Sequence, residues 1–537
     1  MGHPAIPQKS LTDARGPGPV FLVSLILTAL VALWGLVWPD NLARWSSSAL
    51  GFATQTFGWF FLLSAFVFLA FCVYLFFSQY AHIRLGRDHE RSEYSYWSWL
   101  AMLFAAGMGI GLVFFGVAEP IYHFADPPMN LAQPETPQAA RLALRYAFFH
   151  WGLHPWAIYA VMGLAIAYTH FRRNESSLIS ATFRPLLGSR VDGPWGQTID
   201  ILATVATVFG VATSLGLGTL QIAGGMNHLF GIENGRSAWI VIIIVVTALY
   251  MTSAVTGLNR GILMLSKFNM LLAGALLFFV FLIGPTGFIV EAFTTVFADY
   301  IGALLPMSFR LTPFSQGNWL AGWTLFYWAW WIAWAPFVGS FIARVSRGRT
   351  IREFVSGVVL VPAILGAFWF AVFGGSALHF ELFEKHEIAA AAAAGAATHV
   401  STVAEQVATH GGLTAAVQKD VTSALFLSLE QFPAGHLLGA LAALLIATFF
   451  ITSADSATFV LGMFTHRGNP NPPVRLKILW GIVQSALALA LLLSSGKSGL
   501  NSMQTAAIVA ALPFTVVMLL MVFSLKKALS EDPARDG

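Results

Sequence analysis

Twelve long apolar segments constrain the fold of this chain more than any other feature of the sequence. A helix needs ~20 mainly apolar residues to cross a lipid bilayer, and segments of about that length or longer lie at 20–38, 56–79, 97–123, 144–170, 198–230, 237–258, 261–284, 320–343, 353–379, 436–464, 475–495 and 503–525. We expect the longer segments to be tilted or interrupted. Only 10% of the residues are charged, against roughly a quarter in soluble proteins. The sequence therefore predicts an all-α polytopic membrane protein with twelve transmembrane helices.

The basic residues predict how these helices are oriented. With both termini cytoplasmic, the inner segments carry 21 of the 29 Lys and Arg residues, in agreement with the positive-inside rule. The net charge of +4 then reflects topology, and few basic residues remain to bind nucleic acid. Cys72 is the one cysteine, which excludes an intrachain disulfide and a cysteine metal cluster. The first apolar run has the length of a span and no cleavage site after it, so we expect no cleavable signal peptide.

Two segments between the spans differ from short connecting loops. Residues 288–306 are largely apolar, with Glu291 and Asp299 interspersed, and this pattern predicts a helix lying along the membrane interface. The longest external loop, 381–433, contains the alanine-rich run 388–400. Low-complexity alanine indicates a poorly constrained helix or a linker, and we assign no chemistry to it.

A run of tryptophans in the eighth span, between residues 323 and 334, is the most distinctive local pattern. On a helix, Tyr327, Trp330, Trp331 and Trp334 recur at i, i+3, i+4 and i+7, so they lie on one face. An aromatic face in the middle of a span favours a binding wall, whereas we expect the two other tryptophans of the run to serve at the membrane interface or in packing. Pro336 predicts a kinked or loosened turn just beyond the wall.

The third span contains glycines at every second position, Gly107, Gly109 and Gly111. Close helix packing explains single small residues of this kind. Three alternating glycines favour local unwinding, because glycine tolerates backbone conformations that free carbonyl groups from the helix. Carbonyls freed inside a membrane must be satisfied, and a bound cation or substrate can do this.

The tenth span carries Thr452, Ser453 and Asp455 within four residues. A single hydroxyl in a membrane helix usually bonds back to a carbonyl of its own helix. Two adjacent hydroxyls with an intramembrane carboxylate are functional candidates, and their hard oxygen atoms suit Na⁺ as a ligand. For Asp455, a proton carrier and a structural partner of a backbone end remain alternatives.

The fourth span supplies a second aromatic surface, Trp151, Trp156 and Tyr159, spread around a turn expected to be kinked by a proline. His150 and His154 are spaced like a metal pair, but no third ligand follows at a suitable spacing, which favours satisfied core histidines. Two aromatic walls could face each other across a cavity. Such a cavity, with no evident anionic partner, suits a methylated ammonium ion that is attracted to ring faces.

At these residues the sequence resembles the betaine/carnitine/choline transporter family. The similarity extends from about residue 15 to 525 and rests on GMGIGLVFFGVAEP, HWGLHPWAIY, FYWAWWIAWAPFVGSFIARVSRGRTIREF and FFITSADS. It implies a LeuT-type inverted repeat, spans 3–7 against 8–12, after two preceding helices, and a homotrimer in the bacterial inner membrane. The implied segments are a cytoplasmic N-terminus at 1–19, two peripheral helices in 20–95, a first repeat in 96–315, a second repeat in 316–525 and a cytoplasmic tail at 526–537.

The resemblance also implies site residues. Its aromatic box falls on Trp151, Trp156, Tyr159 and Trp331, with Trp330 and Trp334 lining the site, and Ala106, Met108 and Gly109 complete the substrate-binding set. One sodium site falls on Ala105, Met108, Phe449, Thr452 and Ser453. A second falls on Thr207 and Phe337, but Val211 replaces the second threonine of the family pattern, which puts a two-sodium stoichiometry in doubt.

Two further positions discriminate among relatives. Proton-coupled choline carriers resemble one another in having aspartate where this chain has Gly111, and sodium-independent carnitine exchangers have arginine where it has Met270. The short tail after the last span disfavours osmotic activation through the tail. The combined prediction is a symporter that is not an enzyme, has no cofactor and couples glycine betaine import to Na⁺. Choline, carnitine, ectoine or dimethylsulfoniopropionate, possible proton coupling, and an onium-gated channel or receptor remain as alternatives.

Overall fold

The protein is an assembly of helices joined by short connections. The computed structural model describes residues 18–107, 109–256, 259–314, 317–385, 411–495 and 501–536. Within these ranges β pairing is confined to a single bridge between Arg84 and Thr350, and ten helices are long and apolar enough to cross a membrane. The prediction of an all-α polytopic membrane protein is therefore confirmed.

The long helices are α1 (Pro19–Val37), α2 (Pro39–Phe77), α8 (Pro194–Phe230), α9 (Arg236–Thr256), α10 (Asn259–Ile283), α13 (Phe326–Val345), α14 (Ile351–His379), α19 (Gly435–Thr465), α20 (Val474–Ser494) and α21 (Asn501–Ser530). The shorter ones are α3 (Tyr96–Gly107), α4 (Ile110–Ala125), α5 (Pro137–Trp151), α6 (Leu153–Ala167), α7 (Arg184–Leu187), α11 (Thr286–Gly302), α12 (Leu304–Ser308), α17 (Leu413–Lys419) and α18 (Ala424–Leu429). Short 3-10 or π turns are η1 (Pro128–Asn130), η2 (Tyr168–Arg172), η3 (Ser180–Phe183), η4 (Gly188–Asp192), η5 (Ala321–Leu325), η6 (Phe380–Glu384), η7 (Val421–Ser423) and η9 (Pro533–Asp536).

Two predicted spans, 97–123 and 144–170, are each built from two helices. In the first, α3 ends at Gly107 and α4 begins at Ile110, and Gly109 between them is extended, with φ −155° and ψ −176°. The glycine stretch therefore does interrupt its helix. In the second, α5 and α6 meet at Gly152, which has φ −96° and ψ −130°.

The proline expected to kink the fourth span has a different place. Pro155 lies in the first turn of α6, where its missing N–H leaves no helical hydrogen bond unmade. The break comes at Gly152 instead. A side chain there would press against the Tyr300 hydroxyl, 2.8 Å from an added Cβ, so close packing also requires glycine at this position.

Pro336 likewise does not interrupt its helix. Helix α13 continues through Pro336 to Val345, contrary to the expected loosened turn, and the Ser340 hydroxyl donates to the Pro336 carbonyl at 2.6 Å. The irregular turn of this span is the π turn η5, which contains Trp323 at the start of the tryptophan run.

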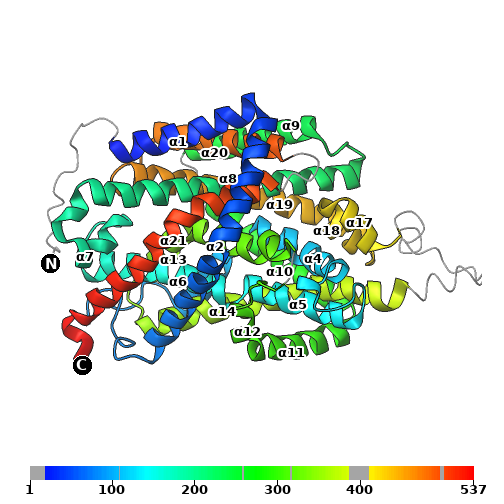
Figure 1. The fold of residues 1–537 in the computed structure, drawn as a ribbon, viewed down its shortest axis with the longest axis horizontal. Helices are drawn as coiled ribbons and strands as arrows, with labels where there is room; N and C mark the ends of the chain where they lie inside the picture. The colour runs from blue at the N-terminus through cyan, green and yellow to red at the C-terminus, as the bar shows by residue number, and fades with distance from the viewer. Residues whose placement is uncertain are drawn as a thin grey trace, which may run out of the picture.

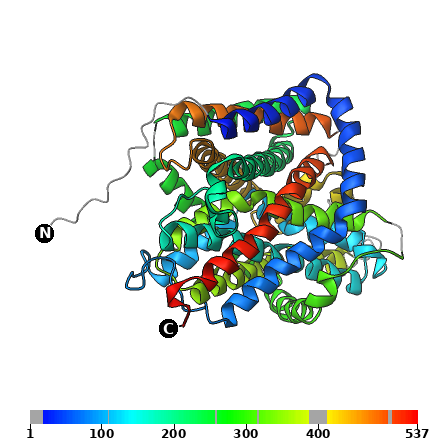
Figure 2. The ribbon, with the colours of Figure 1, turned by 60° about the vertical axis from the view of Figure 1, so that its left-hand side comes forward.

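Helix α13 is the central helix, and it packs against α6, α8 and α21. Trp328, Trp330 and Tyr327 are each at most 2% exposed, so the half of this helix that carries the tryptophans is buried on all sides. Around it, α1 lies beside α20 (Figure 1), and α2 runs beside α21, blue and red in Figure 2. The aromatic face predicted for the eighth span therefore lies inside the helix assembly, away from lipid.

The segments outside the spans are partly helical. Residues predicted as an interfacial helix form α11 and α12, and α11 packs Ile289, Val296 and Tyr300 inward against α5 and α14. The loop predicted to be external contains η6 at its start and α17, η7 and α18 at its end. Its alanine-rich run, 388–400, lies outside the described residues.

Candidate functional site

A cavity of about 1220 Å³ occupies the middle of the helix assembly. It is bordered by the break between α3 and α4 and by α5, α6, α8, α10, α13 and α19. Its aromatic lining includes a group of seven rings, Trp151, Trp156, Tyr159, Trp330, Trp331, Trp334 and Phe337. From these rings the cavity extends toward Arg344, Arg347 and Lys477 at the basic end of the helices.

The aromatic side chains predicted on two separate spans surround the same space. The Trp151 and Trp331 rings are nearly perpendicular, at 72° with centroids 4.8 Å apart. Tyr159 meets Trp331 at 77° and 6.2 Å, and Trp156 meets Tyr159 at 81° and 5.6 Å. Rings at right angles present several π faces to one position, an arrangement suited to a methylated cation.

Hydrogen bonds fix the orientation of these rings. The Trp331 indole Nε1 donates to the His150 carbonyl at 2.9 Å, and the Trp330 Nε1 donates to the Ser214 hydroxyl at 3.2 Å. Trp330 and Trp331 also stack on each other at 4.7 Å and 15°. The site is therefore preorganised, because its rings do not have to be ordered when a ligand arrives.

The other two tryptophans of the run lie outside the cavity lining. Trp328 is fully buried and stacks on His154 at 5.2 Å and 20°. Trp323 packs against His123 with ring centroids 4.4 Å apart. Both are therefore packing residues.

Gly111 lines the cavity and lies against the edges of two rings of the site. A Cβ atom at this position would be 2.8 Å from Cη2 of Trp330 and 3.0 Å from Cη2 of Trp151. These distances are shorter than the ~3.5–4.0 Å of a favourable carbon contact. Any side chain at residue 111 would therefore move two tryptophans.

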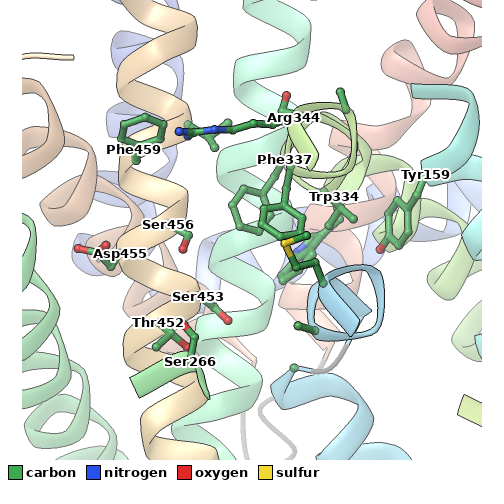
Figure 3. Close-up of a pocket in the computed structure, with 18 of the residues that line it drawn as sticks. Tyr159, Ser266, Trp334, Phe337, Arg344, Thr452, Ser453, Asp455, Ser456 and Phe459 are labelled. Carbon is green, nitrogen blue, oxygen red and sulfur yellow. The ribbon is translucent and has the colours of Figure 1, made fainter. Parts of the chain in front are cut away.

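Oxygen-bearing groups line the same cavity across from the tryptophans. Ala105 from α3 and Phe449, Thr452 and Ser453 from α19 are among the lining residues. Figure 3 shows Ser453 pointing from α19 toward Trp334 and Phe337. Hydroxyl and carbonyl oxygens are ligands that hard cations prefer. Met108 and the surroundings of Ala106 lie outside the described residues, whereas Gly109 lines the cavity.

Thr452 is held by its own helix and by α10. Its hydroxyl donates to the carbonyls of Thr448 and Phe449, at 3.1 and 3.2 Å. It also accepts from the side-chain amide of Asn269 at a long 3.4 Å. A hydroxyl that donates within its helix keeps a lone pair for a cation.

The residues named for a second sodium site differ in their exposure to the cavity. Phe337 and Val211 line it, whereas Thr207 does not, and the buried Thr207 hydroxyl donates to the Ala203 carbonyl at 2.7 Å. Among the other candidates, Met270 lines the cavity. In Figure 3 Asp455 points away from the tryptophans.

One residue with several contacts to the aromatic site was not singled out by the sequence. Glu119, on α4, accepts hydrogen bonds from the Trp151 indole at 2.8 Å and from the Tyr327 hydroxyl at 2.5 Å. It also brings together His123 and His150, so that the ligand atoms of all three lie within 4.8 Å of one another. The predicted pair His150 and His154 does not share this cluster: His154 Nε2 lies 2.9 Å from the Ser308 hydroxyl, and the second histidine beside Glu119 is His123, from the third span.

Comparisons with known proteins agree with this geometry. The glycine betaine transporter OpuD of Bacillus subtilis (strain 168) is 49% identical over 515 residues, which is 96% of this chain and 94% of that protein. The ectoine/hydroxyectoine transporter of Virgibacillus pantothenticus is 42% identical and covers 96% of each chain. A glycine betaine transporter of Acinetobacter baylyi is 39% identical over 99% of this chain and 76% of its own length.

The model of the betaine/carnitine/choline family transporters, BCCT, matches residues 19–410 and 401–534, nearly the whole chain. This family consists of transporters and not of enzymes. With its multi-pass helical structure and aromatic cavity, the chain belongs to the betaine/carnitine/choline transporter family.

Proposed function

We propose that this protein is a sodium-coupled symporter that imports a quaternary ammonium compatible solute, with glycine betaine as the first candidate. The observation that carries the proposal is the shared cavity: Trp151, Trp331 and Tyr159 face a space that Thr452 and Ser453 also line. Ring faces suit the onium group and the oxygen atoms suit Na⁺. Two of the relatives described above carry the name glycine betaine transporter, which supports this choice of solute.

The proposed mechanism is alternating access. Na⁺ bound between the third and tenth spans stabilises the outward-facing, substrate-ready state, and release of Na⁺ down its gradient permits inward opening. We propose that both termini are cytoplasmic. In that orientation the basic end of the cavity, with Arg344, Arg347 and Lys477, faces the cytoplasm, so the conformation described here is inward-facing.

The proposed architecture has twelve spans in the bacterial inner membrane, ten as long helices and two as the pairs α3/α4 and α5/α6. It divides into two peripheral helices, an inverted repeat at 96–315 and another at 316–525, and assembles as a homotrimer. The break at Gly107–Gly109 near the start of the first repeat supports this division, because discontinuous helices carry the binding sites of such transporters. One sodium site is favoured over two, because Val211 stands where the family pattern has the second threonine.

Uptake in proteoliposomes tests the proposal. We expect accumulation of labelled glycine betaine against its gradient only when an inward Na⁺ gradient is present at clamped pH. Accumulation that is unchanged in sodium-free buffer would reject the coupling, and equilibration without accumulation would indicate a channel or receptor.

A matched pair of variants locates the sodium site. Thr452→Ala removes a cavity-lining hydroxyl, so we expect a higher Na⁺ concentration for half-maximal uptake. Thr448→Ala removes a hydroxyl one turn away that donates to Leu444 and lies outside the lining, and we expect little change. Equal effects of the two substitutions would show that helix stability is being measured instead.

Ectoine is the second candidate solute, because one relative carries the name ectoine/hydroxyectoine transporter. Choline is disfavoured, since Gly111 leaves the site without the carboxylate that choline carriers share. A competition panel of glycine betaine, ectoine, choline, carnitine and dimethylsulfoniopropionate against labelled glycine betaine ranks these solutes directly.

A further inference from the structure

Glu119 is the most heavily hydrogen-bonded carboxylate near the cavity. It lies on α4 and is 0% exposed. Its Oε2 accepts from Trp151 and Tyr327, and its Oε1 lies 2.6 Å from Nδ1 of His150 and 3.2 Å from Nε2 of His123. Four donors around two oxygens fill the acceptor capacity of an ionised carboxylate.

The two histidines fit this arrangement as neutral rings. Nδ1 of His123 has no hydrogen-bond partner among the described residues, so a doubly protonated His123 would bury an unpaired N–H group. Nε2 of His150 lies 2.9 Å from the Thr324 hydroxyl, which can donate to it while Nδ1–H donates to Glu119. With the tautomers assigned from this network, the cluster carries one net negative charge.

A metal ion fits these three residues poorly. The nitrogens that would bind it, Nδ1 of His150 and Nε2 of His123, are the ones that face Oε1 as donors. Binding would require both to lose their protons and the carboxylate to lose two of its four donors. The hydrogen-bonded cluster is therefore a better description than a metal centre.

The negative charge lies one ring behind the cavity. Neither Glu119 nor Tyr327 is among the lining residues, but each contacts a ring that is. Trp151 is a wall of the site, and Tyr327 stacks on Trp331 at 5.7 Å and 20°. A carboxylate that accepts from an indole N–H polarises the ring, and in a low-dielectric interior its own field reaches the cavity. The cavity, expected from sequence to lack an anionic partner, has one behind its rings.

Because Glu119 lies behind the rings, it can act on a ligand through its charge without accepting a hydrogen bond from it. A carboxylate inside the cavity would offer acceptors to primary ammonium and guanidinium groups, which would then bind in preference to methylated ions. Behind the rings, its acceptors are already filled, and only its field acts on the ligand. Fully methylated cations need the field and no acceptor.

We propose that Glu119 is a specificity-determining residue, the remote counter-charge that makes the aromatic site prefer a cation over a neutral group of the same shape. It acts through Trp151 and Tyr327 and does not touch the ligand. This inference rests on the proposed onium site.

The test compares two ligands that differ only in charge at the head. Glycine betaine carries a trimethylammonium group, and 3,3-dimethylbutanoate carries a tert-butyl group of nearly the same shape. Their inhibition constants against labelled glycine betaine, measured on purified transporter in detergent, give a charge-preference ratio. We expect this ratio to fall by about 10-fold or more in Glu119→Gln, as the loss of a full charge at low dielectric implies.

The possible outcomes distinguish an effect of the Glu119 charge from a role of Glu119 in holding the rings in place. If Glu119 only braces the rings, both ligands weaken in parallel and the ratio is unchanged, which overturns the proposal. Glu119→Asp keeps the charge but disturbs the contacts, so we expect weaker binding of both ligands at a preserved ratio, and a collapsed ratio in this variant also overturns it. This second variant keeps the proposal falsifiable if Glu119→Gln does not fold.

Tyr327→Phe is the matched control, because it removes one donor to Oε2 and leaves the carboxylate in place. We expect its ratio to stay near that of the wild type. The wild-type measurement comes first, because it tests the proposed solute separately from the proposed role of Glu119. No saturable glycine betaine binding by the wild type would reject the proposed solute, whereas normal wild-type binding with an unchanged ratio in Glu119→Gln rejects only the counter-charge.

Discussion

Adding one methyl group at Gly111 tests the geometry of the aromatic site most directly. The Cβ of Gly111→Ala would lie 2.8 Å from Trp330 and 3.0 Å from Trp151. Favourable carbon contacts need ~3.5–4.0 Å, so both rings must retreat by several tenths of an ångström. Neither ring can retreat freely, because Trp330 is hydrogen-bonded to Ser214 and Trp151 to Glu119.

The size of the effect follows from this overlap. Overpacking of a tight interior costs ~1–3 kcal/mol, and every ~1.4 kcal/mol changes affinity about tenfold. If the displacement of the rings weakens the binding free energy by that ~1–3 kcal/mol, the apparent affinity for glycine betaine falls by roughly 5- to 150-fold. Alanine is the better helix former by ~0.5–1 kcal/mol, so the folded protein itself is not expected to be lost.

The assay is the KM of Na⁺-driven uptake in proteoliposomes, together with thermal stability of the purified variant. Gly274→Ala is the matched control, since a Cβ there meets nothing within 4 Å and the KM is expected to stay unchanged. Gly109→Ala is informative within the same stretch, because a Cβ there also meets nothing within 4 Å, and a smaller effect is expected. A wild-type KM in Gly111→Ala would refute the packing of Trp330 and Trp151 on this glycine.

Three further predictions concern the rings, the selectivity position and the tail. Trp331→Ala should raise the KM for glycine betaine, since each cation–π contact contributes ~0.5–2 kcal/mol, and Trp331→Phe should recover part of the loss in the same uptake assay. Gly111→Asp should lower glycine betaine affinity by the same overlap, so that a gain in glycine betaine affinity in a competition assay would contradict the packing. At the chain end, burial raises the pKa of Asp532, but hydrogen bonds from Arg172, the Ala534 N–H and Tyr168 outweigh it and hold that pKa below its usual value. A carboxyl group whose pKa is lowered by folding stabilises the fold at pH values above its ordinary pKa, and this stabilisation is lost as the pH falls through the pKa of the folded state. Thermal stability should therefore drop on acidification below about pH 4. The drop should be less steep in Asp532→Asn.

The sequence predicted the ten long apolar helices, because bilayer thickness imposes a length on every helix that crosses it. It also predicted the break at Gly107–Gly109, because alternating glycines remove the side chains that favour a helix. The expectation for Pro155 was wrong, because Pro155 lies in a first turn, where proline is harmless. At Pro336 the expected loosened turn is absent, since the helix continues to Val345.

The aromatic residues could be grouped in advance because helix periodicity places Trp330, Trp331 and Trp334 on one face. The meeting of that face with Trp151 and Tyr159 depends on which spans are neighbours, and spacing along the chain carries no information on this. The same limitation hid the cluster behind the rings. His150 and Glu119 are 31 residues apart and lie on different helices, yet their side chains are 2.6 Å apart.

The two intramembrane carboxylates near the site show what sequence rules miss. An ionisable residue within a span is a functional candidate, and that rule was applied to Asp455 but applies equally to Glu119, which stands among apolar residues of the third span. The structure separates the two. Oδ1 of Asp455 has no hydrogen-bond partner among the described residues and the residue lines the cavity, whereas Glu119 has a donor for every lone pair and no access to it. A carboxylate that exchanges protons needs access to water, and one that serves as a fixed charge needs permanent donors. Glu119 meets the second requirement, so the fixed charge of the site is assigned to it and not to Asp455.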